Sequence, residues 1–489
     1  MPFLSFASNN MQQYADAVAS GANPDWRIKE ALLFSIGSLN EVISLYPDLV
    51  ANIEPMLKAH VLPDFSSPHL LLKSRACWAY GEFSEYEFSD QAHIQQAVDG
   101  IYKCLFVDNL PIKFSAALSL SKMLKNESAV AFLKPALQNI LEVYLKIMEE
   151  IDSDELIGAL EQFVEIYSED IGPFAIQLAQ QLTNKYKALV VDDQNDDDDE
   201  AEEKCLAAAG CVTAMRRIIE AINKDKDGLR AILPIIYPIL MHSLTPDGLD
   251  AIEEGLDCIN IFIYYACDRT TRIPAELWKL LPQMMYIVAG KQDDVDGGFA
   301  FEFLGQVAVC LQNFIAKDPE TLMLVGEGQT ETYFQLAVKF VQQVLVINSN
   351  GVHKQDGVTI MRVLISIFEN LPGQIDSALP HLVGILLAEL KLSFENGAPK
   401  NYKSMLLQTI SMALFNNSVA VLSIFEAEGQ TVAVFANWLN FMKHFKLEFE
   451  IRRIVFGLLS ILKTPGANMP PVVQQQLPQI TKQLGDLAR

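Results

Sequence analysis

Apolar residues recur at helical spacing along almost the whole chain. Between positions 402 and 413, for example, they fall at Tyr402, Met405, Leu406 and Ile410, which places them on one face of a helix. No stretch shows sustained alternation of apolar and polar residues bounded by hairpin turns. The pattern therefore predicts an all-α protein.

Clusters of Gly, Pro, Asn and Asp interrupt the periodic segments about every twenty residues and mark their ends. The helices predicted in this way span residues 9–20, 26–45, 50–62, 69–84, 91–106, 111–124, 128–149, 153–168, 170–190, 204–222, 228–243, 249–267, 274–289, 298–316, 330–347, 354–371, 375–391, 401–416, 418–428, 430–443, 446–463 and 469–487.

The predicted helices come in pairs, and the second members share a pattern. Segments 28–39, 72–83 and 112–123 each begin with an apolar residue and a lysine, at offsets of 44 and 40 residues. Two helices per 40 to 44 residues is the period of HEAT and armadillo repeats. One pair is too small to bury its own apolar face, so we expect antiparallel pairs to stack into an α-solenoid, a superhelix with an extended binding surface.

One segment breaks the helical pattern. Residues 192–203 (DDQNDDDDEAEE) contain nine acidic side chains among twelve, and such a block repels itself and buries nothing. We expect an acidic disordered loop between a first arm of repeats, 1–191, and a second arm, 204–489. The loop is either a solvated spacer or an anionic arm that contacts a basic partner. Its acidic residues are Asp192, Asp193, Asp196, Asp197, Asp198, Asp199, Glu200, Glu202 and Glu203.

Composition sets limits on the partners. Half of the 489 residues are apolar, and 37 basic against 61 acidic residues give a net charge of −24. Such a charge predicts an acidic surface that repels nucleic acid and anionic lipid and attracts basic proteins. The longest apolar run, 231–241, is too short to span a bilayer. The first ten residues lack the features of a secretory signal, so we expect an intracellular protein.

The sequence contains no recognisable catalytic, cofactor-binding or metal-binding motif. We therefore expect no catalytic residue, no cofactor and no metal ligand, and hence no enzyme. Segment 223–228 (NKDKDG) matches the start of a calcium loop, but the twelfth position is Pro234 instead of glutamate. We interpret it as a turn between helices. Gly326 and Gly328 form a lone GxG without a preceding strand. The seven cysteines form no CxxC pair and are expected to be reduced core residues.

Several segments together resemble a known family. They are 27–42 (RIKEALLFSIGSLNEV), 70–88 (LLLKSRACWAYGEFSEYEF), 110–124 (LPIKFSAALSLSKML) and the acidic insertion followed by 204–222, which contains Thr213-Ala214-Met215. Their order resembles the carboxy-terminal half of the importin seven and importin eight branch of the importin-beta, or karyopherin, family.

The resemblance implies a monomeric nuclear import receptor that carries basic cargo, such as ribosomal proteins or histones, past Phe-Gly nucleoporins of the nuclear pore. It also implies release on binding GTP-loaded Ran, with the main Ran site in amino-terminal repeats that have no counterpart here. We therefore expect a fragment or a truncated gene product, found in cytoplasm, nucleus and nuclear envelope. An export receptor of the same superfamily and a HEAT scaffold outside transport are the alternatives.

Overall fold

The structure, a computed structural model, describes residues 2–487 except 152, 192–197, 292–296 and 350–353. Throughout this part of the chain the regular elements are helices, and pairing between strands is limited to one isolated bridge between Val325 and Thr332. The predicted all-α class is confirmed, and the helix pairs form an α-solenoid.

The chain divides into two compact units, Met1–Ile239 and Leu240–Arg489, and the division falls inside α14. The helices that begin in the first unit are α1 (Pro2–Ala19), α2 (Trp26–Gly37), α3 (Asn40–Ser44), α4 (Pro47–Val50), α5 (Ile53–Met56), α6 (Leu70–Glu82), α7 (Gln91–Cys104), α8 (Leu110–Met123), α9 (Glu127–Leu133), α10 (Leu137–Glu150), α11 (Asp154–Ile166), α12 (Ala175–Val191), α13 (Asp198–Ala221) and α14 (Lys226–Ser243).

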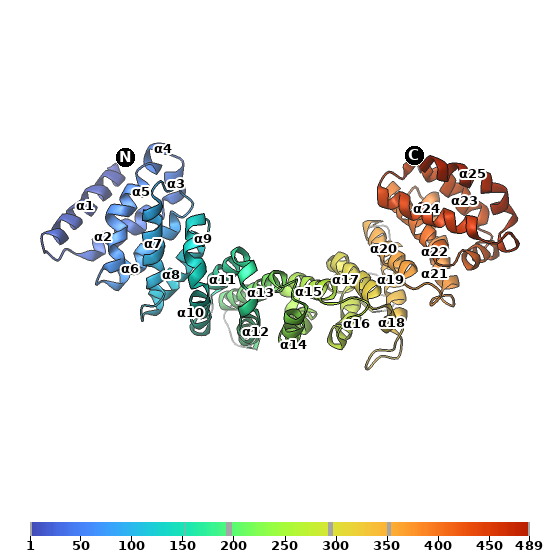
Figure 1. The fold of residues 1–489 in the computed structure, drawn as a ribbon, viewed down its shortest axis with the longest axis horizontal. Coiled ribbons are helices and arrows are strands. Elements are labelled where there is room, and N and C mark those ends of the chain that lie inside the picture. The colour runs from blue at the N-terminus through green and yellow to red at the C-terminus, as the bar shows by residue number, and fades with distance from the viewer. Residues whose placement is uncertain (1, 152, 192–197, 292–296, 350–353, 488–489) are drawn as a thin grey trace. The chain divides into compact units, whose positions relative to one another are not determined.

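The second unit continues the pattern (Figure 1). Its α-helices are α15 (Ile252–Ile261), α16 (Ala275–Ala289), α17 (Leu304–Lys317), α18 (Pro319–Leu322), α19 (Tyr333–Ser349), α20 (Lys354–Asn370), α21 (Leu379–Glu395), α22 (Lys400–Ala427), α23 (Thr431–Phe441), α24 (Glu448–Lys463) and α25 (Pro471–Leu487). The π-helical turns are η1 (Leu57–Val61) and η7 (Phe262–Ala266). The short 3-10 helices are η2 (Leu62–Ser66), η3 (Lys134–Ala136), η4 (Ser168–Asp170), η5 (Gly172–Phe174), η6 (Pro246–Ala251), η8 (Phe301–Phe303), η9 (Met442–His444) and η10 (Gly466–Asn468).

The second helices of successive pairs form one continuous layer within each unit. In the first unit α2, α6, α8, α11 and α13 pack in that order, and in the second unit α15, α17, α20, α22 and α24 do so. Helices α2, α6 and α8 begin at Trp26, Leu70 and Leu110, so they are 44 and 40 residues apart. These are the offsets that the sequence pattern predicted.

The two compact units divide within α14, whereas the sequence predicted a division at residues 192–203. Helices α12 and α13, on either side of that segment, pack against each other and against α10 and α11. The acidic segment is therefore a connection inside the first unit. A charge run marks a solvated surface, but it carries no information about where the contacts between repeats become sparse.

Polar side chains cap the amino ends of several helices. Asp90 accepts hydrogen bonds from the backbone N–H of Ala92 and His93, and Asn109 accepts one from Ile112. These bonds satisfy N–H groups that have no partner within the first helical turn. The helices α7 and α8 are thereby fixed at their amino ends.

The structure breaks two of the predicted helices with a π turn. The helix expected at 50–62 consists of α5, η1 and the start of η2, and the helix expected at 249–267 consists of η6, α15 and η7. A π turn adds a residue to the helical turn without a distinct composition, so periodicity alone does not locate it. The helix expected at 26–45 ends earlier, at Gly37, and is followed by α3.

Helix α22 joins the two helices predicted at 401–416 and 418–428, and Asn417, with φ −154° and ψ 88°, interrupts it at the predicted break. Among the described helices, α22 alone has the length and apolar composition of a membrane-crossing helix. However, 67% of its apolar window is buried inside the unit, as expected for a core helix whose neighbours are α20, α21 and α24.

A buried ion pair joins the first helices of the chain. The Nζ atom of Lys29 in α2 lies 2.6 Å from Oδ1 of Asp64 in η2, and each side chain is only 7% exposed. The Lys29 ammonium also lies 5.1 Å from the ring centre of Tyr14 in α1. Burial raises the pKa of Asp64 to about 6, and the neighbouring Lys29 opposes that rise. Three separate elements therefore meet at one buried charge pair.

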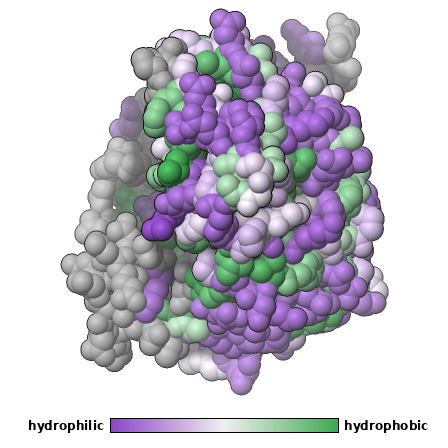
Figure 2. Space-filling view, turned by 90° about the vertical axis from the view of Figure 1, so that its left-hand side faces the viewer, coloured by the Kyte–Doolittle hydropathy of each residue, from purple (hydrophilic) through white to green (hydrophobic). Residues whose placement is uncertain are grey.

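Hydrophilic residues cover most of the face in the space-filling view, with smaller hydrophobic patches between them (Figure 2). The core lies between the helix layers, where Trp438, Tyr80 and Tyr144 are completely buried. The hydroxyl of Tyr144 donates to the carbonyl of Ala117, 2.5 Å away, so this polar group is satisfied inside the core.

The contact between α22 and α24 gives a stability prediction. A Cβ atom added at Gly457 would lie 2.7 Å from the Cα of Ser411, so Gly457→Ala forces two helix backbones apart. We expect a loss of about 1–3 kcal/mol, typical of overpacking. The matched control is Gly384→Ala in α21, where a Cβ would meet nothing within 4 Å. It should gain up to about 1 kcal/mol from helix propensity. Urea unfolding followed by circular dichroism measures both, and equal effects would contradict this packing.

Candidate functional site

The structure describes only part of the acidic segment. Residues 192–197, which include Asp192, Asp193, Asp196 and Asp197, lie outside the described residues. The other five predicted binding residues, Asp198, Asp199, Glu200, Glu202 and Glu203, lie in the first two turns of α13. The expectation of a disordered loop up to 203 is wrong for these positions.

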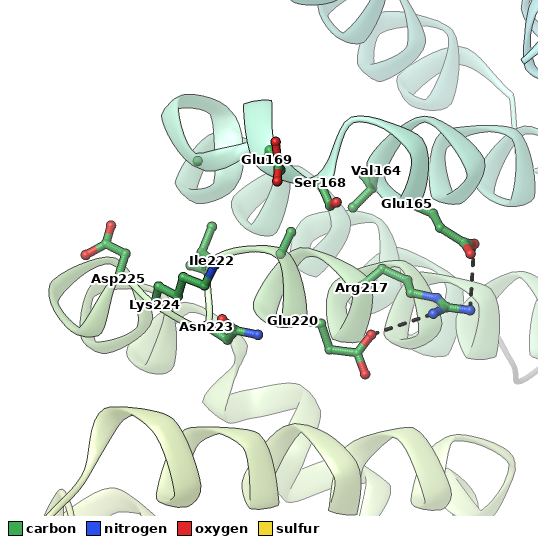
Figure 3. A pocket seen from close by; sticks show the side chains of 12 residues that line it. Val164, Glu165, Ser168, Glu169, Arg217, Glu220, Ile222, Asn223, Lys224 and Asp225 are labelled. Carbon is green, nitrogen blue, oxygen red and sulfur yellow. Dashed lines mark ion pairs between the residues drawn. The ribbon is translucent and has the colours of Figure 1, made fainter. Parts of the chain in front are cut away.

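The first unit has a cavity of about 700 Å³ at the other end of the same helix. It lies between the end of α11, η4 and the last turn of α13 with the loop that follows (Figure 3). Its walls are formed by Val164, Glu165, Ser168, Glu169, Gly172, Arg217, Glu220, Ala221, Ile222, Asn223, Lys224 and Asp225.

Arg217 is the central charge of this cavity. Its guanidinium contacts three carboxylates, with Nε 3.1 Å from Glu161, Nη2 3.8 Å from Glu165 and Nη1 3.7 Å from Glu220. Figure 3 shows the side chain directed toward Glu165 and Glu220. The hydrogen bond to Glu161, with the nearby carboxylates, raises the pKa of Arg217, and desolvation opposes the rise. The arginine is therefore held in place as a cation.

Negative charge still exceeds positive charge in the cavity wall. The wall contains four carboxylates, those of Glu165, Glu169, Glu220 and Asp225, and two cations. The Glu165 side chain is 58% exposed, so it retains hydrogen-bonding capacity toward solvent or a ligand. Because carboxylates attract cations at short range, a wall with more carboxylates than cations favours a lysine or arginine side chain.

The loop that resembles a calcium site forms part of this wall. Asp225 accepts a hydrogen bond from the backbone N–H of Gly228 at 3.0 Å, and α14 begins at Lys226. The interpretation as a turn between helices is confirmed. Among the described residues no group of three or more His, Cys, Asp or Glu side chains is arranged to hold a metal ion.

Polar contacts that tie neighbouring repeats together were missed by the sequence reasoning. In the first unit Arg75 of α6 pairs with Glu30 of α2 at 2.6 Å and lies 4.6 Å from the ring centres of Phe34 and Trp78. In the second unit Arg453 of α24 donates to the side chain of Gln408 in α22 at 3.1 Å. The Arg75–Glu30 and Arg453–Gln408 contacts each join residues 45 positions apart, so only the repeat offset could have suggested them.

The motif that carried the family resemblance is a packing motif. In α13 the side chains of Ala214 and Met215 are buried, and the hydroxyl of Thr213 donates to the carbonyl of Ala209 at 3.2 Å. Ala214 and Met215 have no surface available to a partner, and Thr213 is half-buried. They mark how α13 fits its neighbours.

The chain is similar in sequence to known importin-like proteins. No family model matches it. It is 26% identical over 99% of its length to an importin beta-like SAD2 homolog of Arabidopsis thaliana, and 25% identical over 98% to a probable importin-7 homolog of Dictyostelium discoideum. It is 24% identical over 96% to importin-8 of Homo sapiens. Its homologues are importin-7-like and importin-8-like proteins.

The match to these importins covers only part of them. The chain spans about half the length of the curated relatives, between 43% and 45% of the three proteins named above. The similarity extends over at least 96% of the chain, so it includes most of both units.

Solved structures share the fold. The exportin Cse1 in its cargo-free, cytoplasmic state gives a TM-score of 0.66 at 13% identity, covering 99% of this chain and 49% of that one. Kap95p in complex with RanGDP gives 0.63 at 13% identity, covering 100% of this chain and 58% of that one. At this identity the likeness shows the importin-type solenoid fold alone.

The cavity gives a binding prediction. Glu165→Gln with Glu169→Gln removes two of its four wall carboxylates, so a short lysine-rich peptide should bind about two- to fivefold more weakly, in line with partly exposed ion pairs. The control is Glu149→Gln with Glu150→Gln at the end of α10, which makes the same change in net charge outside the cavity. Fluorescence anisotropy at low salt measures both. Equal weakening would show that only the overall field matters.

Proposed function

We propose that this chain acts as a nuclear transport receptor of the importin-beta type, which binds basic protein cargo and carries it into the nucleus. The observation that carries the proposal is the similarity to importins over 96–99% of the chain. The cargo is a lysine- and arginine-rich protein such as a ribosomal protein or a histone. The chain works by binding and performs no chemistry.

The arrangement of acidic groups on α13 supports a basic, extended ligand. The acidic first turns begin at Asp198, and Arg217 with its surrounding carboxylates lies 19 residues later on the same helix. At 1.5 Å per residue the two ends are roughly 28 Å apart. An extended segment of about nine residues spans that distance. A basic tail that runs along the helix would therefore reach both ends of α13.

Neutralising the acidic segment tests this proposal. We expect replacement of all nine acids between 192 and 203 by Asn or Gln to weaken binding of a lysine-rich cargo roughly tenfold at 0.1 M salt, since several exposed pairs of up to about 1 kcal/mol each are lost. The slope of affinity against salt should also become shallower. Titration at three salt concentrations measures both quantities.

The outcome that contradicts the proposal is specific. If affinity and its salt dependence stay unchanged while circular dichroism shows the helices intact, the segment is a spacer. A matched control replaces nine exposed acids elsewhere in the chain, so that the net charge changes equally. Its effect on affinity should be smaller, because screening limits charges farther than about 10 Å from the ligand at 0.1 M salt.

Release of cargo is the second part of the proposal. We propose that cargo dissociates when GTP-loaded Ran binds and that few of the contacts with Ran are made by these residues. We expect GTP-loaded Ran to displace cargo from this chain only weakly, because an effector acts through differential binding to two states. Titrating GTP-loaded Ran against the cargo complex checks this. Tight one-to-one displacement would place a Ran site within these residues.

The same titration separates import from export. The fold of the exportin Cse1 is also shared, and an export receptor would bind cargo more tightly in the presence of GTP-loaded Ran. Binding to Phe-Gly nucleoporin repeats separates a transport receptor from a HEAT scaffold of another pathway. We propose that the protein is a monomer that moves between cytoplasm and nucleus through the nuclear pore.

A further inference from the structure

Charge is distributed unevenly along the chain. Residues 391–489 contain ten Lys and Arg against six Asp and Glu, a balance of +4, although the whole chain has a balance of −24. The expectation of an acidic surface throughout is therefore wrong for the last fifth of the sequence. The rest of the chain is acidic and repels anions, whereas this segment is basic and attracts them. Such a local change in the sign of the charge affects which partners can bind there.

Several of these cations lie together in the second unit. Lys400 begins α22, while Lys443 and His444 lie in η9 and Lys446 follows it. Partial burial, followed by the positive charges of Lys400, Lys443 and Lys446, lowers the pKa of His444. The three lysines are exposed, and within the described part of the chain none forms an ion pair. A carboxylate does lie nearby, because Glu450 accepts a hydrogen bond from the backbone N–H of Lys446 at 3.1 Å, but it forms no ion pair with the lysine ammonium.

Aromatic rings connect this cluster to a cavity. The ring of Phe441 lies 4.8 Å from His444 and 6.2 Å from Phe394 of α21, and the ammonium of Lys403 lies 4.8 Å from the Phe394 ring. Phe394 also lines a cavity of about 350 Å³ between α21 and α23. Its other lining residues are Leu387, Leu390, Lys391, Glu395, Gln430, Ala433, Val434 and Asn437.

The geometry points to a docking site for an acidic peptide segment of a partner protein. We propose that one apolar side chain of that segment enters the cavity beside Phe394. The flanking Asp and Glu side chains then contact Lys400, Lys443 and Lys446, which we call the lysine cluster, and Lys403, whose ammonium lies against the Phe394 ring. This site is independent of the basic-cargo surface proposed above, which lies in the first unit and has the opposite charge.

Charge and shape favour a peptide over a nucleic acid. A nucleic acid strand presents one phosphate per nucleotide over a long distance, and the net charge of −24 opposes its approach. A short acidic peptide carries fewer charges and supplies an apolar anchor of the size that the cavity accepts. The cavity wall contains one cation, Lys391, and one carboxylate, Glu395, so neither sign of charge is favoured and an uncharged group fits best.

The test measures binding of a fluorescent twelve-residue peptide, rich in Asp and Glu with one central leucine, to the full chain at several salt concentrations. The variant Lys400→Gln with Lys443→Gln and Lys446→Gln should bind at least tenfold more weakly. The control variant, Lys291→Gln with Lys463→Gln and Lys482→Gln, removes three exposed lysines elsewhere that also form no ion pair among the described residues. It should bind nearly as tightly as the unmodified chain.

Three further ligands decide between occupants. An uncharged Phe-Gly peptide should be unaffected by the lysine variant, and so should a lysine-rich peptide, which reports the proposed cargo function separately. Equal loss in both triple variants overturns the site, because only net charge would then matter. Tighter binding of a single-stranded RNA of equal charge than of the peptide overturns the choice of partner. Insensitivity to replacing the central leucine by serine overturns the role of the cavity.

A spectroscopic readout follows the same site without relying on affinity. Acidic peptide bound at the lysine cluster offsets the positive charges around His444, so the pKa of its imidazole should rise on binding. It should also rise in the lysine variant without peptide, since that variant removes the same charges. Proton NMR of the histidine C–H signals measures both shifts. A His444 pKa that is unchanged by saturating peptide would place the peptide elsewhere.

Discussion

Each helix pair in this protein buries its apolar face only against the pair before it and the pair after it. The layer α6, α8, α11 shows the rule, because α8 packs on both neighbours while α6 and α11 lie on opposite sides of it. Stability of such an array is a sum of local terms. A site on one pair can therefore change in charge or shape while distant pairs keep their packing.

This locality explains how surfaces of opposite charge coexist in one chain. The carboxylates around Arg217 belong to α11 and α13, whereas the lysine cluster belongs to α22, η9 and the loop after it. Each surface depends on two or three consecutive elements. A basic ligand and an acidic ligand would consequently meet separate groups of side chains, and binding of one need not rearrange the groups that hold the other.

The fold class could be predicted from the sequence because it depends on the helical spacing of apolar residues, and this spacing recurs in every repeat. Starts of α2, α6 and α8 at offsets of 44 and 40 residues are visible in the sequence itself. The π turns η1 and η7 were not, since one extra residue per turn leaves the apolar pattern nearly intact. The sequence did not indicate the start of α13, because a run of acidic residues there is typical of a solvated loop.

The cavity near Arg217 could not be predicted from the sequence, because nothing in the sequence shows that Glu161, 56 positions earlier, contacts Arg217. The lysine cluster was not predicted because the net charge of the whole chain, −24, does not show that its last fifth is basic.

The buried pair of Lys29 and Asp64 limits how this sequence can change. Removing one partner leaves the other as an uncompensated buried charge, at a cost of about 3–5 kcal/mol, whereas exchanging both for apolar residues of similar volume is often neutral. Single substitutions at either position are thus selected against, although the double substitution is accessible. Among descendants of this sequence the two positions should vary together or not at all. Lys29 of α2 and Asp64 of η2, although 35 positions apart in the chain, should therefore covary in evolution.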